Sequence, residues 1–269
     1  MQTKNRTEKK KGIFGKIFLA LLGAYLLIPF GMTLIYSLFV EWTDVLPHGF
    51  TLRNYTELFS DGEFWGSIGR TLVLCAVSVL FTIAVLLLAM YVVVAVNRRL
   101  AKLMQTVCMI PYALQGVILS ISIISLYSGT GTVLSNRMMM LFGAYTILVL
   151  PYIYQGIRNS LNAINAEMLL QAAAMLGCGK FRAYLQIVLP NIFSGVIVSA
   201  LLAQSIVFGD FVLANNIAGN NYQNIQVFLN RRMFKSSGLA SAIVVIIFVV
   251  VLLITWAVLK LQDKQNKED

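Results

Sequence analysis

Few side chains in this sequence could carry acid–base, metal or covalent chemistry, and Asp210 is the most notable of them. It is the only acidic residue within a long apolar segment. A charge in such a segment costs at least a few kcal/mol unless it faces water or a partner. Asp210 is therefore either a residue of a solute path, near its outer mouth, or an interfacial group with a structural role. The sequence leaves both interpretations open.

Other polar side chains within or beside the apolar segments carry no charge. Such residues could line a path, although they more often form hydrogen bonds between helices, which is the favoured interpretation here. The candidates for a translocation path, together with Asp210, are Gln204, Asn215, Gln115 and Tyr112.

The remaining reactive residues argue against an enzyme or a metal site. Cys75 and Cys108 fall in apolar runs and Cys178 in a polar loop, which is typical of small packing residues. His48 has no second candidate ligand nearby in the sequence. There is no Walker sequence and no cluster of His, Asp, Ser or Glu. We expect no catalytic residue and no metal, and any ATP and Mg²⁺ would be bound by another chain.

The elements that carry these residues are predicted to be membrane helices. Of the residues, 58% are hydrophobic and only 12% are charged, against ~25% charged in soluble domains. The apolar runs are continuous and about as long as a bilayer is thick, which favours helices over a barrel. The predicted fold is an all-α membrane protein with six transmembrane helices, at Ile17–Val40, Thr71–Val96, Leu103–Tyr127, Met138–Ile157, Asn191–Leu213 and Leu239–Lys260.

Charge placement predicts the orientation. With the amino terminus inside, most of the 21 Lys and Arg residues fall on the cytoplasmic side, so both termini are expected there, although Arg231 and Arg232 weaken the bias. The net charge of +10 sits at span ends and in one tail, which argues against nucleic acid as a partner. The expected organisation is a basic cytoplasmic tail (1–16), one transmembrane domain (17–260) with a cytoplasmic loop at 158–190, and a second cytoplasmic tail (261–269).

The loop between the fourth and fifth spans has the pattern of two short helices joined at a glycine. Asn165 can cap the first helix and Gly177 can end it in the left-handed conformation. Pro190 is expected to mark the turn into the fifth span. The first helix should carry an apolar stripe of Met168, Leu169, Ala172, Met175 and Leu176, and a second helix at about Lys180–Val188 should present Phe181, Tyr184 and Val188.

A specific spacing runs through this loop. It reads Gln171-Ala172-Ala173, three residues, Gly177, nine residues, then Ile187-x-Leu189-Pro190. It resembles the cytoplasmic EAA loop of ABC importer permeases, which in that family docks onto an ATP-hydrolysing subunit. The motif's leading Glu is Gln171 here. Either the partner surface has adapted, or Glu167 one turn earlier takes over part of its role.

The resemblance implies a permease of the type I ABC importer fold in the bacterial inner membrane, a multi-pass protein that hydrolyses nothing itself. The implied partners are ABC ATPase subunits, a second permease of different sequence, an extracytoplasmic solute-binding protein and the lipid bilayer. The residues expected to couple the permease to the ATPase are Glu167, Gln171, Ala172, Ala173, Gly177, Ile187, Leu189 and Pro190.

A second segment points to a branch of this family. Phe208-Gly209-Asp210-Phe211, continuing to Ala218-Gly219, resembles the end of the fifth span in polyamine, ferric-iron and aminophosphonate importers. This implies a small polar solute of that kind. A sugar-type permease is the alternative within the family. An ion-coupled secondary transporter is the alternative outside it, and it would usually show several intramembrane ionisable residues.

Overall fold

The computed structural model describes residues 2–41, 48–114, 116–129, 131–219, 222–234 and 236–268. Gln115 lies outside these residues. The described part is helical except for one antiparallel ribbon, in which β1 (Phe39–Glu41) pairs with β2 (His48–Phe50). The chain divides into two units, one of residues 1–61 and 229–250 and the other of residues 62–228 and 251–269.

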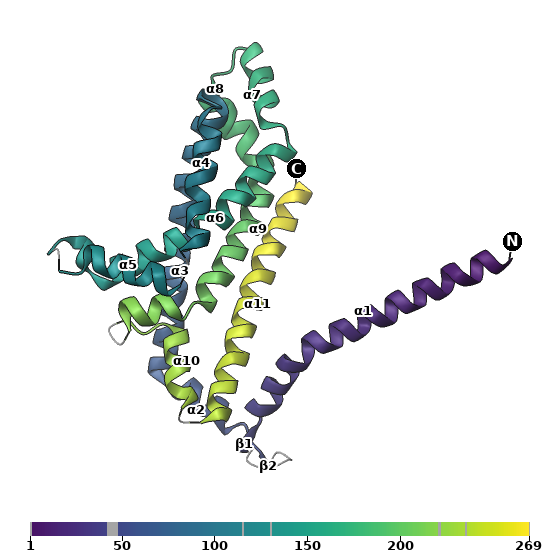
Figure 1. Cartoon of the computed structure of the whole chain (residues 1–269), viewed down its shortest axis with the longest axis vertical. Helices are drawn as coiled ribbons and strands as arrows, with labels where there is room; N and C mark the ends of the chain where they lie inside the picture. The colour runs from purple at the N-terminus through teal and green to yellow at the C-terminus, as the bar shows by residue number, and fades with distance from the viewer. Residues whose placement is uncertain are drawn as a thin grey trace. The chain divides into compact units, whose positions relative to one another are not determined.

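Three long helices form the centre of the larger unit (Figure 1). They are α3 (Gly62–Tyr91), which continues as the π-helix η1 (Val92–Val96), α6 (Arg137–Ala163) and α9 (Leu189–Gly209). Helix α6 packs against both of the others and is the most buried of the membrane-length helices. Residues that could otherwise sit in lipid, such as Tyr145 and Tyr154, are instead enclosed by protein.

Helices α6 and α9 approach closely because glycines face serines where they cross. A β-carbon on Gly156 would collide with the side chain of Ser199, and one on Gly195 would collide with that of Ser160. Each helix thus contributes a glycine and, four residues later, a serine. Small residues at this spacing are a known means of bringing membrane helices together.

The third predicted span is broken. The single helix expected at Leu103–Tyr127 is instead α4 (Leu100–Met109), a 3₁₀ turn η2 (Ile110–Ala113) and α5 (Val117–Tyr127), with a bend of 103°. Pro111, which lacks an N–H, and Gly116, at φ +66°, explain the break. Helix α5 therefore leaves the direction of α4, as Figure 1 shows.

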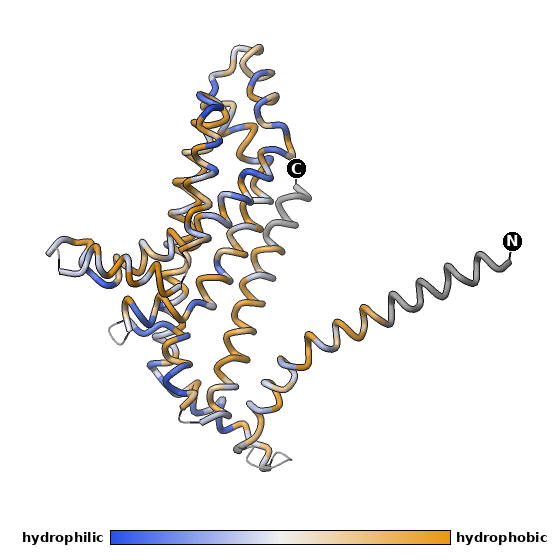
Figure 2. The backbone as a smooth tube through the Cα atoms, in the orientation of Figure 1, coloured by the Kyte–Doolittle hydropathy of each residue, from blue (hydrophilic) through white to orange (hydrophobic). Residues whose placement is uncertain are grey.

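Five described helices are long and apolar enough to cross a membrane, or six if α4 and α5 together count as one span. This agrees with the predicted all-α membrane fold. The first is α1 (Gln2–Ser37) and the last is α11 (Ser237–Glu268), so the helical backbone extends into both predicted tails. Both helices that contain an internal proline, α1 at Pro29 and α6 at Pro151, continue through it. Figure 2 shows mainly hydrophobic residues along Phe18–Ser37 of α1 and Ser237–Lys260 of α11.

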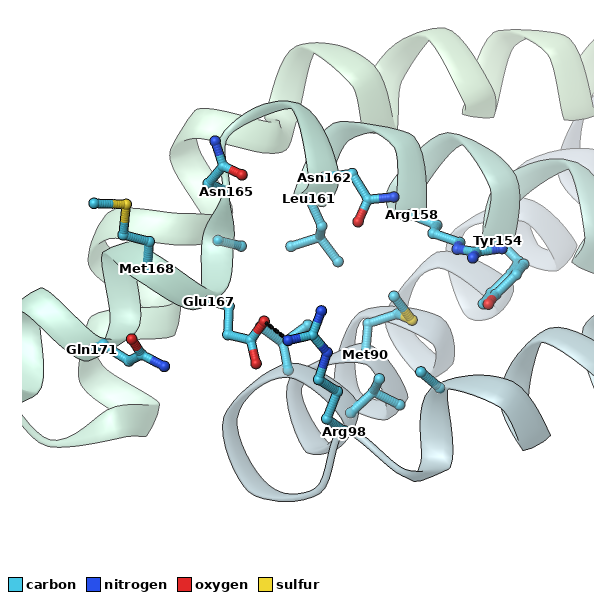
Figure 3. A pocket seen from close by; sticks show the side chains of 14 residues that line it. Met90, Arg98, Tyr154, Arg158, Leu161, Asn162, Asn165, Glu167, Met168 and Gln171 are labelled. Atoms are coloured by element: carbon cyan, nitrogen blue, oxygen red, sulfur yellow. Dashed lines mark ion pairs between the residues drawn. The ribbon is translucent and has the colours of Figure 1, made fainter.

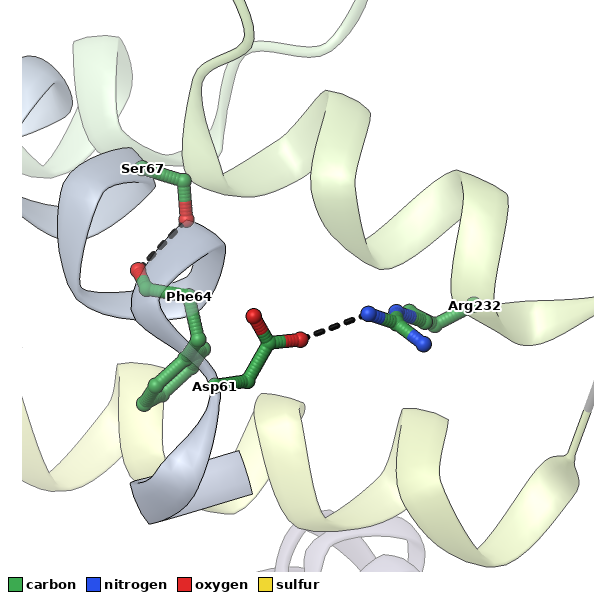
Figure 4. A network of polar contacts seen from close by, with 4 residues as sticks. All are labelled: Asp61, Phe64, Ser67 and Arg232. Carbon is green, nitrogen blue, oxygen red and sulfur yellow. Dashed lines mark hydrogen bonds and ion pairs between the residues drawn. The ribbon is translucent and has the colours of Figure 1, made fainter. Parts of the chain in front are cut away.

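The smaller unit contains α2 (Arg53–Ser60), a short amphipathic helix. The Asn54 amide donates hydrogen bonds to the carbonyl oxygens of Ser37, at 3.0 Å, and Phe39, at 3.3 Å. Asp61 forms an ion pair of 2.6 Å with Arg232 of α10 (Ile225–Met233), as Figure 4 shows. Arg232, one of the two arginines that weaken the predicted charge bias, therefore has its charge balanced by Asp61.

Candidate functional site

The loop singled out by its spacing folds as an elbow of α7 (Ala166–Met175) and α8 (Lys180–Ala183). Gly177 lies between the two at φ +80°, so the predicted left-handed glycine is confirmed. The Cys178 N–H donates to the Ala173 carbonyl and the Gly177 N–H to the Ala174 carbonyl, both at 3.0 Å. This is the Schellman pattern, which satisfies the last carbonyls of α7 and gives the elbow a defined shape.

The two faces of α7 differ sharply. Ala166, Leu170 and Ala173 face the bundle and are buried, with Ala173 only 5% exposed. The opposite face is apolar and exposed, at 71% for Met168, 90% for Met175 and 89% for Leu176; Gln171 and Ala172 are exposed as well. The structure thus separates the two alanines of the motif. Ala172 is available to a partner, whereas Ala173 packs inside this chain.

The start of α7 differs from the sequence expectation. Asn165 adopts the left-handed conformation, at φ 50°, and forms no side-chain cap with the described residues. Glu167 does lie in the first turn, but its carboxylate pairs with Arg98, at 2.7 Å. Arg98 belongs to the turn between η1 and α4, so Glu167 connects α7 to the end of a different predicted span.

The second arm of the elbow is continuous with the fifth span. From Lys180 the helix runs through the π-helix η4 (Tyr184–Val188) into α9, so the predicted turn at Pro190 is absent from this stretch. Pro190 has no N–H to donate, and the helix accommodates this by widening just before it, where the Leu189 N–H donates to the Tyr184 carbonyl.

The inner residues of this arm hold it against α3. The Tyr184 hydroxyl donates to the Leu87 carbonyl at 2.9 Å, and the Lys180 ammonium donates to the Ala95 carbonyl at 3.1 Å. Tyr184 and Val188, expected to be presented outward, are instead buried, while Phe181 is half exposed. Ile187 and Leu189 are half-buried and Pro190 is exposed.

Asp210 lies where the helix of the fifth span stops. Its carboxylate accepts hydrogen bonds from the backbone N–H groups of Leu213, at 3.0 Å, and Ala214, at 3.3 Å. It also accepts one from the Tyr145 hydroxyl on α6, at 3.3 Å. It therefore caps the helical segment that continues into the π-helix η5 (Ala214–Ala218) and attaches that segment to α6. These contacts favour the structural interpretation of Asp210 over direct contact with a solute.

The two interrupted helices meet each other. An added β-carbon at Gly116, in the break between α4 and α5, would lie 3.9 Å from Val212, just beyond the break after α9. The Asn216 amide donates to the Ser120 hydroxyl of α5 at 2.8 Å. Irregular backbone at membrane depth is tolerated where protein buries it or where it lines a water-filled cavity.

The other proposed path residues do not gather into one site. Tyr112 is 40% exposed, accepts a hydrogen bond from the Gln155 amide at 3.2 Å and stacks edge-on with Tyr152. Gln204 is half-buried on α9 and Asn215 is exposed in η5. Gln115 lies outside the described residues.

Sequence reasoning did not identify Arg98, Tyr145 or Asn224 as functional residues. The Asn224 amide donates to the Tyr145 hydroxyl at 3.5 Å and to the Asp210 carbonyl at 3.4 Å, and it completes the cluster around the helix end. Nothing in local sequence pairs these residues, because they are 14 to 79 positions apart. The Gly–Ser spacing on α6 and α9 is the one missed signal that the sequence does contain.

Comparison with known proteins supports the family expected from the loop. Residues 62–267 match the family described as binding-protein-dependent transport system inner membrane component. Proteins of Salmonella paratyphi A and Salmonella typhimurium, both provisionally named 2-aminoethylphosphonate transport system permease protein PhnV, are 20% identical over 207 residues, which cover 76% of each chain.

A solved structure agrees with the fold. A chain from the crystal structure of a bacterial ABC transporter involved in the import of the acidic polysaccharide alginate superposes with a TM-score of 0.68. The match covers 95% of this chain and 96% of that one, at 14% identity. Because the family match spans most of the sequence, this chain belongs to the binding-protein-dependent transport system inner membrane components, the non-catalytic permease subunits of ABC importers, whose ATPase is a separate protein.

Proposed function

We propose that the α7–α8 elbow is the element through which the separate ATPase drives this permease. The observation that carries the proposal is the apolar outer face of α7, where Met168, Met175 and Leu176 are exposed beside a tightly folded turn. Covering apolar surface stabilises a complex by about 25 cal/mol for each Å² removed from water. Ala172, with its small side chain, permits a partner to approach this face closely.

The elbow is connected so that its movement would reach the membrane. Helix continues without a break for 30 residues from Lys180 to Gly209, which corresponds to about 45 Å. Lys180 attaches the elbow to the end of the second span by a hydrogen bond to the Ala95 carbonyl, and Glu167 adds an exposed ion pair with Arg98 beside it. A displacement of α7 by the ATPase would therefore carry α9 with it and move the break at Asp210.

In this proposal the chain forms half of a translocation path, paired with a second permease of different sequence. ATP binding by the ATPase subunits moves the elbows and shifts the population between inward-open and outward-open states. The solute-binding protein delivers substrate on the outer side. Both termini and the loop at 158–190 lie in the cytoplasm, and residues 17–260 form the transmembrane domain.

For the path itself, we propose that Tyr112 and Asn215 face the solute, because the side chains of both are exposed and not packed between the described helices. Asp210 would shape the path by holding the helix end in place, since its carboxylate already accepts three hydrogen bonds. Gln204 is half-buried and its backbone carbonyl faces Cys75, so we assign it a smaller part. Gln115 remains a candidate from sequence.

We propose that the substrate is a small polar solute, such as an aminophosphonate, a polyamine or ferric iron. The segment Phe208–Gly219 supports this branch, and among the three the PhnV relatives favour an aminophosphonate. A sugar-type solute is the alternative. The family assignment argues against an ion-coupled secondary transporter.

The test places a charge on the outer face of α7. Met175→Glu should abolish co-purification of the ATPase from mild detergent while leaving the fold intact, because this side chain is 90% exposed. Val133→Glu, which adds the same charge at a 75% exposed site in the 3₁₀ turn η3 (Val133–Ser135), is the matched control and should retain the ATPase. Equal retention by both variants would contradict the proposed docking face.

A further inference from the structure

A pocket of about 600 Å³ lies within the larger unit, beside the first turns of α7, where Met168 and Gln171 of its exposed face line it (Figure 3). Its walls come from three stretches: the end of α3 with η1 and the turn into α4, the last turns of α6, and the first turns of α7. Charge placement puts all three in the cytoplasm. A volume of this size suits a small-molecule ligand.

The charged side chains in the pocket are predominantly basic. Arg98 and Arg158 line it together with a single carboxylate, that of Glu167. Glu167 is engaged with Arg98, whereas Arg158 is half-buried and has no carboxylate within ion-pair distance among the described residues. The polar lining also includes Asn162, Asn165 and Gln171, whose amides can donate hydrogen bonds.

We propose that this pocket binds a phosphate-bearing ligand, with Arg158 as its principal contact and Arg98 as the second. Arginine presents a planar fork of donors that matches phosphate oxygens, and the amides can complete the coordination. The phosphate group could belong to a soluble anion of the cytoplasm or to a phospholipid headgroup of the inner leaflet. The recognition chemistry is the same for both.

Such a ligand would act on the elbow, because it would join α6 to the turn that holds α7. The Glu167 carboxylate competes with the ligand for Arg98, since both are anions that pair with the same guanidinium. A bound ligand would draw Arg98 away from Glu167. It would thereby release the first turn of α7 from its ion pair. The pocket is therefore a candidate regulatory site on the cytoplasmic side, independent of which solute is transported.

The experiment uses the assembled importer, purified through a tag on this chain and placed in nanodiscs without nucleotide. In the first arm the nanodiscs contain phosphatidylcholine only, and binding of radiolabelled inorganic phosphate is measured by equilibrium dialysis. In the second arm no phosphate is added, and retention of phosphatidylglycerol from mixed nanodiscs is measured by native mass spectrometry. The signal of interest in each arm is the part that depends on Arg158, because the ATPase subunits can bind phosphate themselves.

Arg158→Gln should weaken binding about tenfold in one arm, as expected when a charge-assisted contact is lost. Arg137→Gln, at the opposite end of the same helix, removes the same charge from an exposed site and should change nothing.

Glu167→Gln should instead tighten binding several-fold, because Arg98 is then free. Misfolding would lower binding, so a gain of affinity cannot be attributed to it. Should Arg158→Gln fail to assemble, Arg158→Lys, which keeps the charge and loses the fork, should give a smaller loss.

An effect of Arg158 confined to the phosphate arm identifies a soluble anion, and one confined to the phosphatidylglycerol arm identifies a lipid headgroup. Equal binding by the Arg158 variants and the Arg137 control in both arms would overturn the proposal. This failure is distinguishable from failure of the docking proposal, which is read from ATPase co-purification by the Met175 variant and not from phosphate binding.

Discussion

Ser160 of α6 occupies the place where a β-carbon of Gly195 would be, so these two residues set how closely α6 and α9 approach. We expect Gly195→Ala to destabilise the permease by about 1–3 kcal/mol, the range for overpacking in a well-packed core. The measurement is thermal unfolding in detergent.

Two further variants test the cause of that effect. Gly143→Ala is a control on α6, the helix that carries Ser160. No described atom lies within 4 Å of its new methyl group, so this variant should be neutral or slightly stabilising. Combining Gly195→Ala with Ser160→Gly should recover part of the loss, because the two residues are in contact. Equal destabilisation by both alanine variants would mean that the close crossing is not the reason.

Gly177 tests the shape of the elbow separately from its contacts. Its φ of +80° strains any residue with a β-carbon, at a cost of roughly 1–2 kcal/mol, yet no described atom lies within 4 Å of the added carbon. Gly177→Val should therefore lower uptake per ATP hydrolysed in proteoliposomes, and Gly177→Asn should do so less, because Asn tolerates the left-handed region. Full uptake by the valine variant would contradict a role in coupling.

Asp210 distinguishes a capping role from a path role. An Asn at this position keeps an oxygen that can accept from the N–H groups of Leu213 and Ala214, whereas an Ala keeps none. We therefore expect Asp210→Asn to retain most uptake, and Asp210→Ala to lose it along with about 1–2 kcal/mol of stability. If Asp210→Asn assembles normally and abolishes uptake, the carboxylate charge acts on the solute after all.

The Asp61–Arg232 pair is mostly shielded, with side-chain exposures of 20% and 26%. Asp61→Asn should cost about 1–3 kcal/mol, between the values for exposed and fully buried pairs. Arg232→Gln combined with it should cost less than the sum of the two single changes, since no unpaired charge remains. Additive losses in thermal unfolding would show that the pair contributes little.

The parts of this fold that were predictable from sequence depend on local physics. Hydropathy located the spans because each must exceed the bilayer thickness, and Gly177 was identified because only a glycine readily takes a left-handed turn. Local physics did not show which of the two alanines of the loop would be buried. Ala172 and Ala173 are equally small, and only the packing of α7 against the bundle determines that the second is buried.

Other features depended on contacts distant in sequence. Pro111 lacks an N–H and can break a helix, but the 103° bend also involves Gly116, which takes a φ of +66°. Glu167 was expected in the first turn of a helix and is there, yet its partner Arg98 lies 69 positions earlier and has no local signature. Pro190 was expected to end a helix, and the π-helix before it allowed the helix to continue.

The contact between the two interrupted helices has an evolutionary consequence. The Ser120 hydroxyl accepts a hydrogen bond from Asn216, and Gly116 lies beside Val212, so residues around each break contact residues around the other. A substitution at one partner removes a hydrogen bond or a fit that the other was selected to match. Homologous sequences are therefore expected to change these positions in concert, and lineages that straighten one interrupted helix should have straightened both.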